Sequence, residues 1–188
     1  MYMDSFYSEE ELTNIGFARY GSNVKISRKT SIYGAELMEF GDNVRVDDFT
    51  VLSGRIVMGS YIHIATLNAI FGGVKGFFID DYSTLSSRCG VYATSDDYSG
   101  RYMTNPTVPN EFTNVTNEKI VIGKHVIVGT GSTILPGSTI GEGCAFGAMS
   151  LIKGDVPPWG IYVGGKLRRI NDRDRNVEML EKKFNESR

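Results

Sequence analysis

Residues 122–143 read IGKHVIVGTGSTILPGSTIGEG, and a bulky apolar residue returns at every sixth position of this stretch. Neither an amphipathic helix, with a period of 3.6, nor a plain strand, with a period of 2, produces that spacing. A chain that forms a short strand, turns by about 120° and repeats does produce it, because three such hexads close one triangular coil. The bulky residue then fills the interior of the coil and stacks on its equivalents in neighbouring coils.

The same register holds in two long stretches of the chain. Its bulky positions are Phe40, Val46, Leu52, Met58, Ile64 and Ile70, then Ile122, Val128, Ile134, Ile140, Phe146 and Ile152. Four residues after each comes a mostly small or β-branched residue: Val44, Thr50, Ile56, Ile62, Asn68, Val74, Val126, Ser132, Ser138, Cys144, Ser150 and Val156. Glycine often follows the bulky residue directly, as at Gly41 and Gly129, which we interpret as tight turns with positive φ. Because sandwiches do not keep a sixfold register, the pattern favours a solenoid.

A second motif carries a family resemblance. Residues 147–165 read GAMSLIKGDVPPWGIYVGG. Together with residues 122–143, they resemble the carboxy-terminal coils of the hexapeptide-repeat acyltransferases, and within these the bacterial sugar acetyltransferases of surface-polysaccharide synthesis. The resemblance covers about residues 20–170. It implies an all-β fold, the left-handed parallel β-helix, and a homotrimer that binds acetyl-CoA in grooves between neighbouring subunits.

The chain divides into a cap at 1–23, a β-helix at 24–170 and a carboxy-terminal helix at 171–188. In the cap, Ser8 followed by Glu9, Glu10 and Glu11 predicts a capping box that opens a short helix, which ends near Gly16. In the last segment, Val177, Leu180 and Phe184 have helical spacing among charged residues, so we expect an amphipathic helix that packs on the coils or on a neighbouring subunit.

Three interruptions break the hexads. The register slips by two residues near 36–38 and bulges by three residues around 72–78. Residues 92–119 then have no period at all, and loops of this length in a compact domain are usually functional or disordered. Because this loop carries several aromatic residues, including Phe112, we expect an ordered flap.

Composition excludes several classes of function. The 188 residues carry a net charge of −2, and the pI is near 5.7, so nothing favours nucleic acid or an anionic membrane as a partner. We find no apolar run of membrane-spanning length and no signal peptide, and expect a cytoplasmic protein without membrane insertion. Cys89 and Cys144 fall at inward positions of hexads and predict small core residues rather than a disulfide or a catalytic thiol.

The resemblance also implies where acetyl-CoA, the co-substrate, binds. Small residues that match the positions lining the pantetheine groove are Gly129, Thr130, Gly131, Gly147 and Ala148. A basic cluster suited to the phosphates of coenzyme A comprises Lys153, Lys166, Arg168 and Arg169. Two plainer interpretations stay open: that the glycines serve only turns, and that the cations form a solvated patch.

The catalytic base is where the chain departs from the family pattern. Sugar O-acetyltransferases of this family carry a histidine just after the middle coils, whereas the matching segment here, residues 92–100, reads YATSDDYSG and has none. Asp96 falls nearest that position, with Asp97 beside it. Of the two histidines in the chain, His125 lies in a coil corner as a surface turn residue, whereas His63 faces outward on a strand. Two histidines are too few for the three-histidine zinc site of the γ-class carbonic anhydrases, which share this fold, so we expect no metal.

The missing histidine favours an amine as the acceptor. A sugar hydroxyl loses about 10²–10⁴ in rate without a general base, whereas an amine with a pKa of about 8 is partly free at neutral pH. We therefore expect an acetyl-CoA-dependent N-acetyltransferase for a nucleotide-linked amino sugar of the dTDP-4-amino-4,6-dideoxyglucose type, with Asp96, Asp97 and His63 as candidate catalytic groups. Candidate acceptor-binding residues are Arg45, Asn68, Tyr92, Tyr98 and Tyr102. The alternatives are a sugar O-acetyltransferase with His63 as its base, or a β-helix that serves as a scaffold without catalysis.

Overall fold

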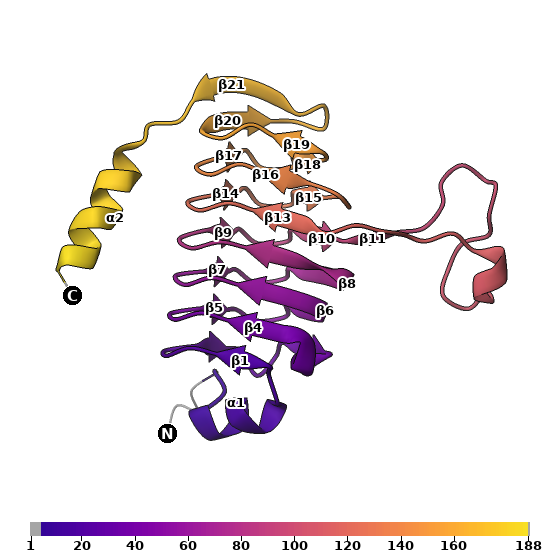
Figure 1. Cartoon of the computed structure of the whole chain (residues 1–188), viewed down its shortest axis with the longest axis horizontal. Coiled ribbons are helices and arrows are strands. Elements are labelled where there is room, and N and C mark those ends of the chain that lie inside the picture. Colours follow the sequence, from indigo (N-terminus) through magenta and orange to yellow (C-terminus); the bar gives the residue numbers. More distant parts are fainter. Residues whose placement is uncertain (1–4, 188) are drawn as a thin grey trace.

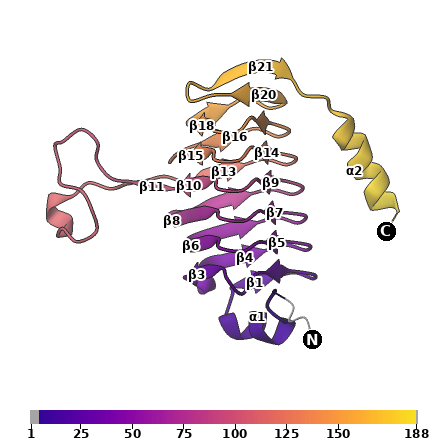
Figure 2. The same ribbon diagram turned by 180° about the vertical axis from the view of Figure 1, so that it is seen from behind.

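The computed structural model of the chain describes residues 5–187, and in this range the chain winds into a β-solenoid of stacked triangular coils (Figure 1). Its strands pair in parallel along the solenoid, with antiparallel exceptions at the chain ends and in the long loop. The all-β, parallel β-helix fold predicted from the hexads is confirmed. A projecting arm and a carboxy-terminal helix stand on opposite sides of the solenoid (Figures 1 and 2).

The coils present three columns of strands. The first column comprises β1 (Arg19–Tyr20), β4 (Met38–Phe40), the end of β6 (Val51–Met58), the end of β8 (Ala69–Ile79), β13 (Ile120–Ile122), β16 (Thr139–Ile140) and β19 (Asp155–Val156). The second comprises β3 (Ser31–Tyr33), the starts of β6 and β8, β10 (Gly90–Tyr92), β15 (Thr133–Ile134) and β18 (Leu151–Ile152). The third comprises β2 (Lys25–Ile26), β5 (Arg45–Val46), β7 (His63–Ile64), β9 (Thr84–Leu85), β14 (Ile127–Val128), β17 (Ala145–Phe146), β20 (Gly160–Val163) and β21 (Arg168–Asp172).

The core is a stack of the bulky hexad residues. In the third column Val46, Ile64, Leu85, Val128 and Phe146 lie in register from one coil to the next, and all five are buried. Every bulky position named from the sequence is buried in the same way. Because burying one such side chain contributes about 1.5–3 kcal/mol, these stacks supply the main stabilising contribution of the coils.

The hexad glycines have a different role from the one expected. Gly41, Gly129 and their equivalents Gly59, Gly123, Gly141 and Gly147 do not have positive φ; that conformation falls two residues later, as at Asn43 (φ 57°) and Gly131 (φ 71°). At Gly129 a Cβ atom would lie 2.6 Å from the backbone nitrogen of Ala148 on the next coil. These glycines therefore allow close approach between coils, and the prediction of a positive φ at them was wrong.

The predicted slip near 36–38 and the predicted bulge around 72–78 are both present, but the position of one residue in the bulge was predicted incorrectly. The two-residue slip contains a 3-10 helix, η1 (Ala35–Leu37), and the three-residue bulge lies in β8, where the pairing with β6 shifts register. Beyond the shift, Ile56 pairs with Phe77, which is fully buried. Val74, predicted from its hexad position to fit a coil corner, is 78% exposed because the bulge carries it out of the hexad register.

Both ends of the solenoid are capped. Helix α1 (Glu9–Ile15) begins with the predicted capping box, in which Glu11 also reaches back to the backbone of Ser8, and ends at Gly16 with a left-handed conformation. Its Leu12 is 2% exposed and covers the first coil. At the other end β21 pairs antiparallel with β20 and closes the last coil.

The carboxy-terminal helix is shorter than predicted. Helix α2 spans Asn176–Glu186, so the boundary set at 171 was wrong by five residues, because Arg168–Asp172 continues the sheet as β21 instead of starting the helix. Helix α2 folds back beside the coils (Figure 1). There Phe184 packs edge-on against Tyr61, and the ring centroids are 5.4 Å apart.

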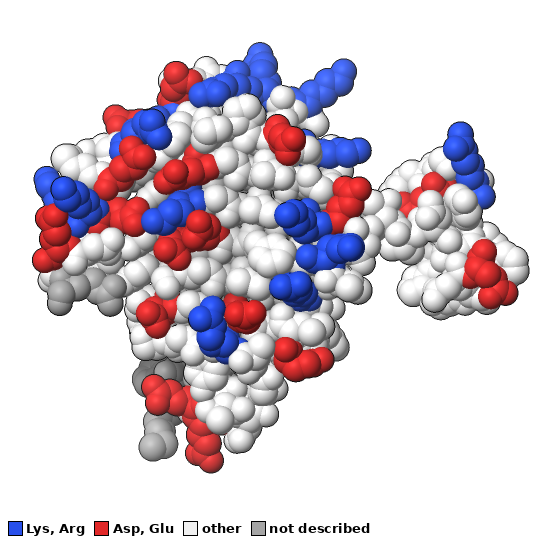
Figure 3. All heavy atoms as spheres, in the orientation of Figure 1, with Lys and Arg blue, Asp and Glu red and all other residues white. Residues whose placement is uncertain are grey.

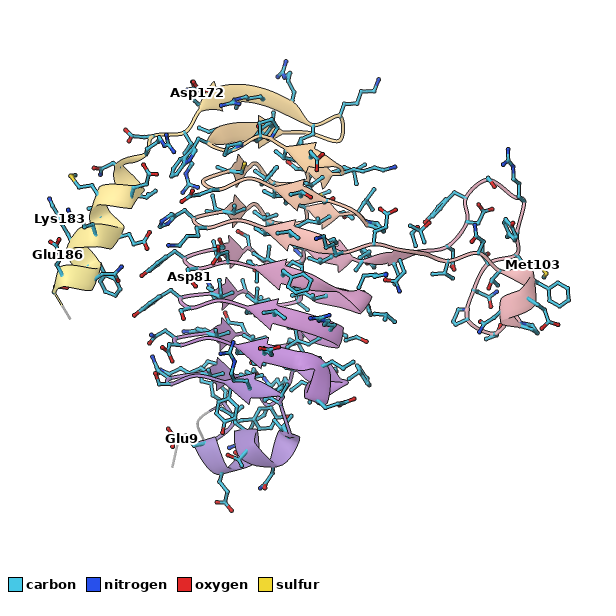
Figure 4. All side chains as sticks on the ribbon, in the orientation of Figure 1. Glu9, Asp81, Met103, Asp172, Lys183 and Glu186 are labelled. Carbon is cyan, nitrogen blue, oxygen red and sulfur yellow. The ribbon has the colours of Figure 1, made fainter. Side chains whose placement is uncertain are left out.

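The long loop forms an arm that projects from the solenoid between β10 and β13. Its stalk is a two-stranded antiparallel ribbon, β11 (Thr94–Ser95) with β12 (Thr116–Asn117), and it carries the 3-10 helix η2 (Asn110–Phe112) near its tip. Met103, at the tip, lies well away from the coils (Figure 4).

Candidate active site

The residues assigned to the pantetheine groove share one corner of the solenoid. Gly129, Thr130 and Gly131 follow β14, and Gly147 and Ala148 follow β17, which pairs with β14 in register. The hydroxyl of Thr130 donates to the carbonyl of Ser87 at 2.6 Å, so it points into the turn and leaves the corner smooth. The corner thus presents backbone and small side chains on two consecutive coils, with the exposed side chain of Met149 lying over Gly131.

The basic cluster lies at the carboxy-terminal end of the solenoid, where lysine and arginine side chains gather (Figure 3). Lys166, Arg168 and Arg169 belong to the β20–β21 hairpin and its turn, and Lys153 follows β18. Arg169 lies over the ring of Tyr162 and binds Asp172 at 2.7 Å, so it also serves to hold the hairpin. The other three are exposed and have no ion-pair partner in residues 5–187, which leaves them available for phosphates.

The two aspartates at the root of the arm differ. Asp97 accepts hydrogen bonds from the hydroxyl of Ser99 and the backbone of Tyr102, and the Ser99 bond, above all, lowers the pKa of Asp97 from its ordinary value. This carboxylate therefore closes a turn. Asp96 is exposed, and its carboxylate makes no hydrogen bond to any described residue. Of the pair, only Asp96 is free to meet a substrate.

His63 belongs to a hydrogen-bonded group that the sequence did not reveal. Its Nε2 lies 2.8 Å from Oδ2 of Asp47, whose Oδ1 accepts from Nε of Arg45 at 2.7 Å. Partial burial of Asp47 acts to raise its pKa, but the hydrogen bonds from His63 and Arg45 outweigh it, so the pKa of Asp47 is lowered. Asp47 stands two residues after Arg45 in the sequence, and that spacing alone gave no sign of a link to His63.

The predicted acceptor residues have different fates. Asn68 is 1% exposed, donates to the carbonyl of Ala65 and accepts from the backbone of Cys89, so its assignment to the acceptor site was wrong: it staples two coils inside the corner. Tyr92 stacks on Phe71 at 5.5 Å beside the root of the arm. Tyr98 is 93% exposed on the arm, and Tyr102 is also exposed there, so neither lines a cavity of its own chain.

One chain does not bring the candidate catalytic groups together. His63 lies in the third strand column, whereas Asp96 follows β11 in the arm, which leaves the solenoid after β10 of the second column (Figure 1). A hollow of about 620 Å³ lies elsewhere on the described surface, on the first column around Val57, Phe78 and Val121. None of the predicted site residues lines it, so we attribute no chemistry to it.

The remaining histidine and both cysteines are structural. His125 is 7% exposed and stacks on Tyr82 beneath α2, so it is a turn residue as predicted but is covered rather than on the surface. Cys89 and Cys144 are unpaired and buried, and burial raises the pKa of both thiols. Within residues 5–187 no group of three potential ligands suits a metal ion, and no helix is long and apolar enough to cross a membrane.

Comparison with known proteins gives the family. Residues 119–154 match the protein family described as "Bacterial transferase hexapeptide (six repeats)". Over 186 residues the chain is 42% identical to a dTDP-4-amino-4,6-dideoxy-D-glucose acyltransferase of Escherichia coli, a match that covers 97% of this chain and 96% of the relative. The chain belongs to the hexapeptide-repeat acyltransferases. The resemblance drawn from the coil motifs is therefore confirmed.

Solved structures agree with this membership. One structure is that of AntD, an N-acyltransferase from Bacillus cereus, which is 47% identical to this chain and superposes with a TM-score of 0.97 over the whole of both chains. It is a complex of a serine variant of AntD with dTDP-4-amino-4,6-dideoxyglucose and coenzyme A. AntD has also been solved with dTDP and 3-hydroxybutyryl-CoA, at 48% identity and a TM-score of 0.96 over 98% of each chain. A hexapeptide-repeat acetyltransferase of Vibrio cholerae, at 17% identity and a TM-score of 0.56 over 88% of this chain, shows the shared fold alone.

Proposed function

We propose that this acyltransferase transfers an acetyl group from acetyl-CoA to the amine of dTDP-4-amino-4,6-dideoxyglucose or a close relative, for surface-polysaccharide synthesis. The full-length match to AntD, which binds that nucleotide sugar and coenzyme A, carries the proposal. The absence of a histidine between Tyr92 and Lys119 supports it, because an amine acceptor needs no strong base.

The reaction we propose is a direct acyl transfer from acetyl-CoA to the amine, through a tetrahedral intermediate. The neutral amine attacks the thioester carbonyl, the carbon–sulfur bond breaks, and coenzyme A leaves as the thiolate. The surplus proton of the amine passes to Asp96 or to water and finally to the thiolate. Because the amine attacks the thioester directly, no acyl-enzyme forms. The backbone N–H groups of Gly129, Gly131 and Gly147 donate to carbonyls of other coils, so the neighbouring N–H groups of Thr130 and Ala148 supply the hydrogen bonds for the developing oxyanion.

The arrangement of the arm supports a trimer. Asp96 and the exposed tyrosines of the arm project away from their own coils, so they meet a groove only if that groove belongs to a neighbouring subunit. We therefore place each active site between two protomers of a homotrimer. We place the enzyme in the cytoplasm, because acyl-CoA and nucleotide sugars are both cytoplasmic metabolites.

The decisive assay follows release of coenzyme A with the amino sugar nucleotide and, in parallel, with its 4-hydroxy counterpart. We expect turnover with the amine only, and a kcat near that of the wild type for amine acylation by His63→Ala at saturating acceptor. Turnover of the hydroxyl substrate that disappears in His63→Ala would establish the O-acetyltransferase instead. If acetyl-CoA fails to raise the melting temperature and no acceptor is used, the protein is a scaffold without catalysis.

The acyl group is tested separately. AntD has been solved with 3-hydroxybutyryl-CoA, so both acetyl-CoA and 3-hydroxybutyryl-CoA belong in the assay. We expect a higher kcat/KM with acetyl-CoA. A higher value with the longer donor contradicts the acetyl assignment and leaves the amine acceptor intact.

A further inference from the structure

We propose that Arg45, Asp47 and His63 form the subsite that holds the diphosphate of the nucleotide-linked acceptor. The inference deepens the N-acyltransferase function proposed above and rests on it. It assigns Arg45 and His63 to anion binding and adds Asp47 as the residue that positions both. The argument follows from the register of the coils, the contacts of Asp47 and the charges on this face.

The first observation is a column of cationic side chains. Lys25 on β2, Arg45 on β5 and His63 on β7 are directly paired from coil to coil, and all three side chains face outward. Adjacent strands lie about 4.8 Å apart, so neighbouring members of the column can bind the same small anion. The next positions along the column are Thr84 and Ile127, which are uncharged, so the cations end at His63.

The second observation is that Asp47 holds the side chains of both Arg45 and His63 by hydrogen bonds. It accepts from Nε of Arg45, and the guanidinium also lies 5.3 Å above the ring of Phe6. The two terminal nitrogens of Arg45 bind no other described residue, and its side chain is 55% exposed. In the same way, Asp47 holds Nε2 of His63, and Nδ1 makes no hydrogen bond to any described residue.

The third observation concerns charge. Arg45 offers its two terminal nitrogens to an incoming anion, and the ring of His63, held by Asp47 through Nε2, presents Nδ1 beside them on the next coil. Charged donors held in a fixed geometry bind phosphoryl oxygens strongly, because little side-chain entropy is lost on binding. Lys25 and Arg45 carry two formal positive charges and Asp47 one negative charge, so this part of the face stays net positive, which favours an anionic ligand such as a nucleotide diphosphate ester.

The experiment measures binding of dTDP, thymidine and coenzyme A by calorimetry to the full-length protein and its variants. We expect Arg45→Ala and His63→Ala each to weaken dTDP binding by about 10-fold to 100-fold. Affinity for thymidine, which has no phosphate, and for coenzyme A, whose phosphates we assign to the basic cluster at the carboxy-terminal end of the solenoid, should not change. Arg175→Ala is the matched control, because Arg175 also uses Nε in an ion pair, with Glu178, and lies over an aromatic ring, that of Trp159.

Steady-state kinetics test Asp47 as a positioning residue. Asp47→Asn should raise the KM of the acceptor about 10-fold with little change in kcat or in the KM of acetyl-CoA, and Asp47→Glu, which keeps the charge, should recover part of the loss. A purely structural role would instead lower the melting temperature and change all three constants.

The outcomes separate this inference from the proposed function. If the wild-type protein does not bind dTDP at all, the proposed acceptor class is wrong and the subsite falls with it. If the wild-type protein binds dTDP and the Arg45 and His63 variants bind it equally well, only the subsite is overturned. Loss of turnover in His63→Ala with unchanged dTDP affinity also overturns the subsite and makes His63 a general base.

Discussion

The carboxylate of Glu181 holds two residues of one coil corner, with Oε2 2.7 Å from Nε2 of His125 and Oε1 2.8 Å from Nζ of Lys124. The hydrogen bond from Lys124, above all, lowers the pKa of Glu181, and His125 adds to the effect. Beside this contact Tyr61, Tyr82 and His125 stack on consecutive coils. Glu181 therefore binds helix α2 to a stack of three aromatic rings, which belong to turn residues with positive φ.

Glu181→Gln should release α2 without unfolding the coils. Loss of a hydrogen bond to a charged group corresponds to at least about a 10-fold rise in local opening, so amide hydrogen exchange in residues 176–186 should rise by that factor. Glu178→Gln, on the same helix but paired only with Arg175, is the control. Unchanged exchange in Glu181→Gln would show that other contacts hold the helix.

The same contact predicts a pH dependence. Since the pKa of Glu181 is lower in the folded protein than its ordinary value of 4.5, its stabilising contribution is complete above that pH. It is lost as the pH falls below 4.5 through the folded-state pKa. Fluorescence or exchange probes on α2 should report release in this window in the wild type, and the Glu181→Gln variant should lack that transition.

Gly129→Ala should destabilise the solenoid by about 1–3 kcal/mol, because its Cβ would collide with the backbone of Ala148. Gly165→Ala is the matched control, since a Cβ there meets no atom within 4 Å. Chemical denaturation measures both. If Gly129 also lines the pantetheine groove, the KM of acetyl-CoA should rise in Gly129→Ala and stay constant in Gly165→Ala.

Asn68→Ala should lower the free energy of unfolding by about 2 kcal/mol, because the buried backbone N–H of Cys89 loses its acceptor. Thermal denaturation tests the loss of stability. The KM of the acceptor at a temperature where the variant is folded should match the wild type. A selective rise in that KM would return Asn68 to the acceptor site.

Asp96→Asn should lower kcat by about 10²-fold with the amine acceptor, because the amide cannot take the proton. Asp97→Asn should instead loosen the turn that Asp97 closes with Ser99 and Tyr102, which increases proteolysis between residues 97 and 102. Single-turnover rates and limited proteolysis distinguish the two effects. Equal losses of kcat in both variants would contradict the separate roles.

Cys89 and Cys144 should not react with a thiol reagent in the native protein at pH 8. Both are buried and their pKa values are raised by burial, so little thiolate forms and none is accessible. In denaturant both thiols should react. Rapid labelling of the native protein would show that one of the cysteines lies in an accessible site.

Much of the fold was predictable because the hexads repeat a physical constraint. Each inward residue packs on its equivalents one coil away, so a single register error would expose an entire column, and positions such as Val128 and Ile134 were placed correctly. The exceptions occur where coil length changes. Val74 was misplaced because a bulge hides its register, and Asn171 was assigned to a helix because the antiparallel return of β21 leaves no periodic signal.

The candidate site was less accessible to sequence reasoning. Asp96 was proposed because it falls nearest the position of the missing histidine, with Asp97 beside it, but the sequence did not show that Asp97 is engaged in a turn with Ser99 and Tyr102. Asn68 was proposed for the acceptor site, whereas the coil corner uses its side-chain amide for internal hydrogen bonds. Asp47 was missed because its partners stand on different coils.

By itself, the sequence determined that the chain folds into stacked triangular coils with a defined interior, since a period of six residues fixes which side chains point inward. It also determined that the segment after the middle coils has no histidine. Only the tertiary structure decided which outward side chains meet, such as Asp47 with Arg45 and His63, or Glu181 with His125. Those contacts depend on how coils of unequal length align and where α2 folds back, and the local pattern of residues specifies neither.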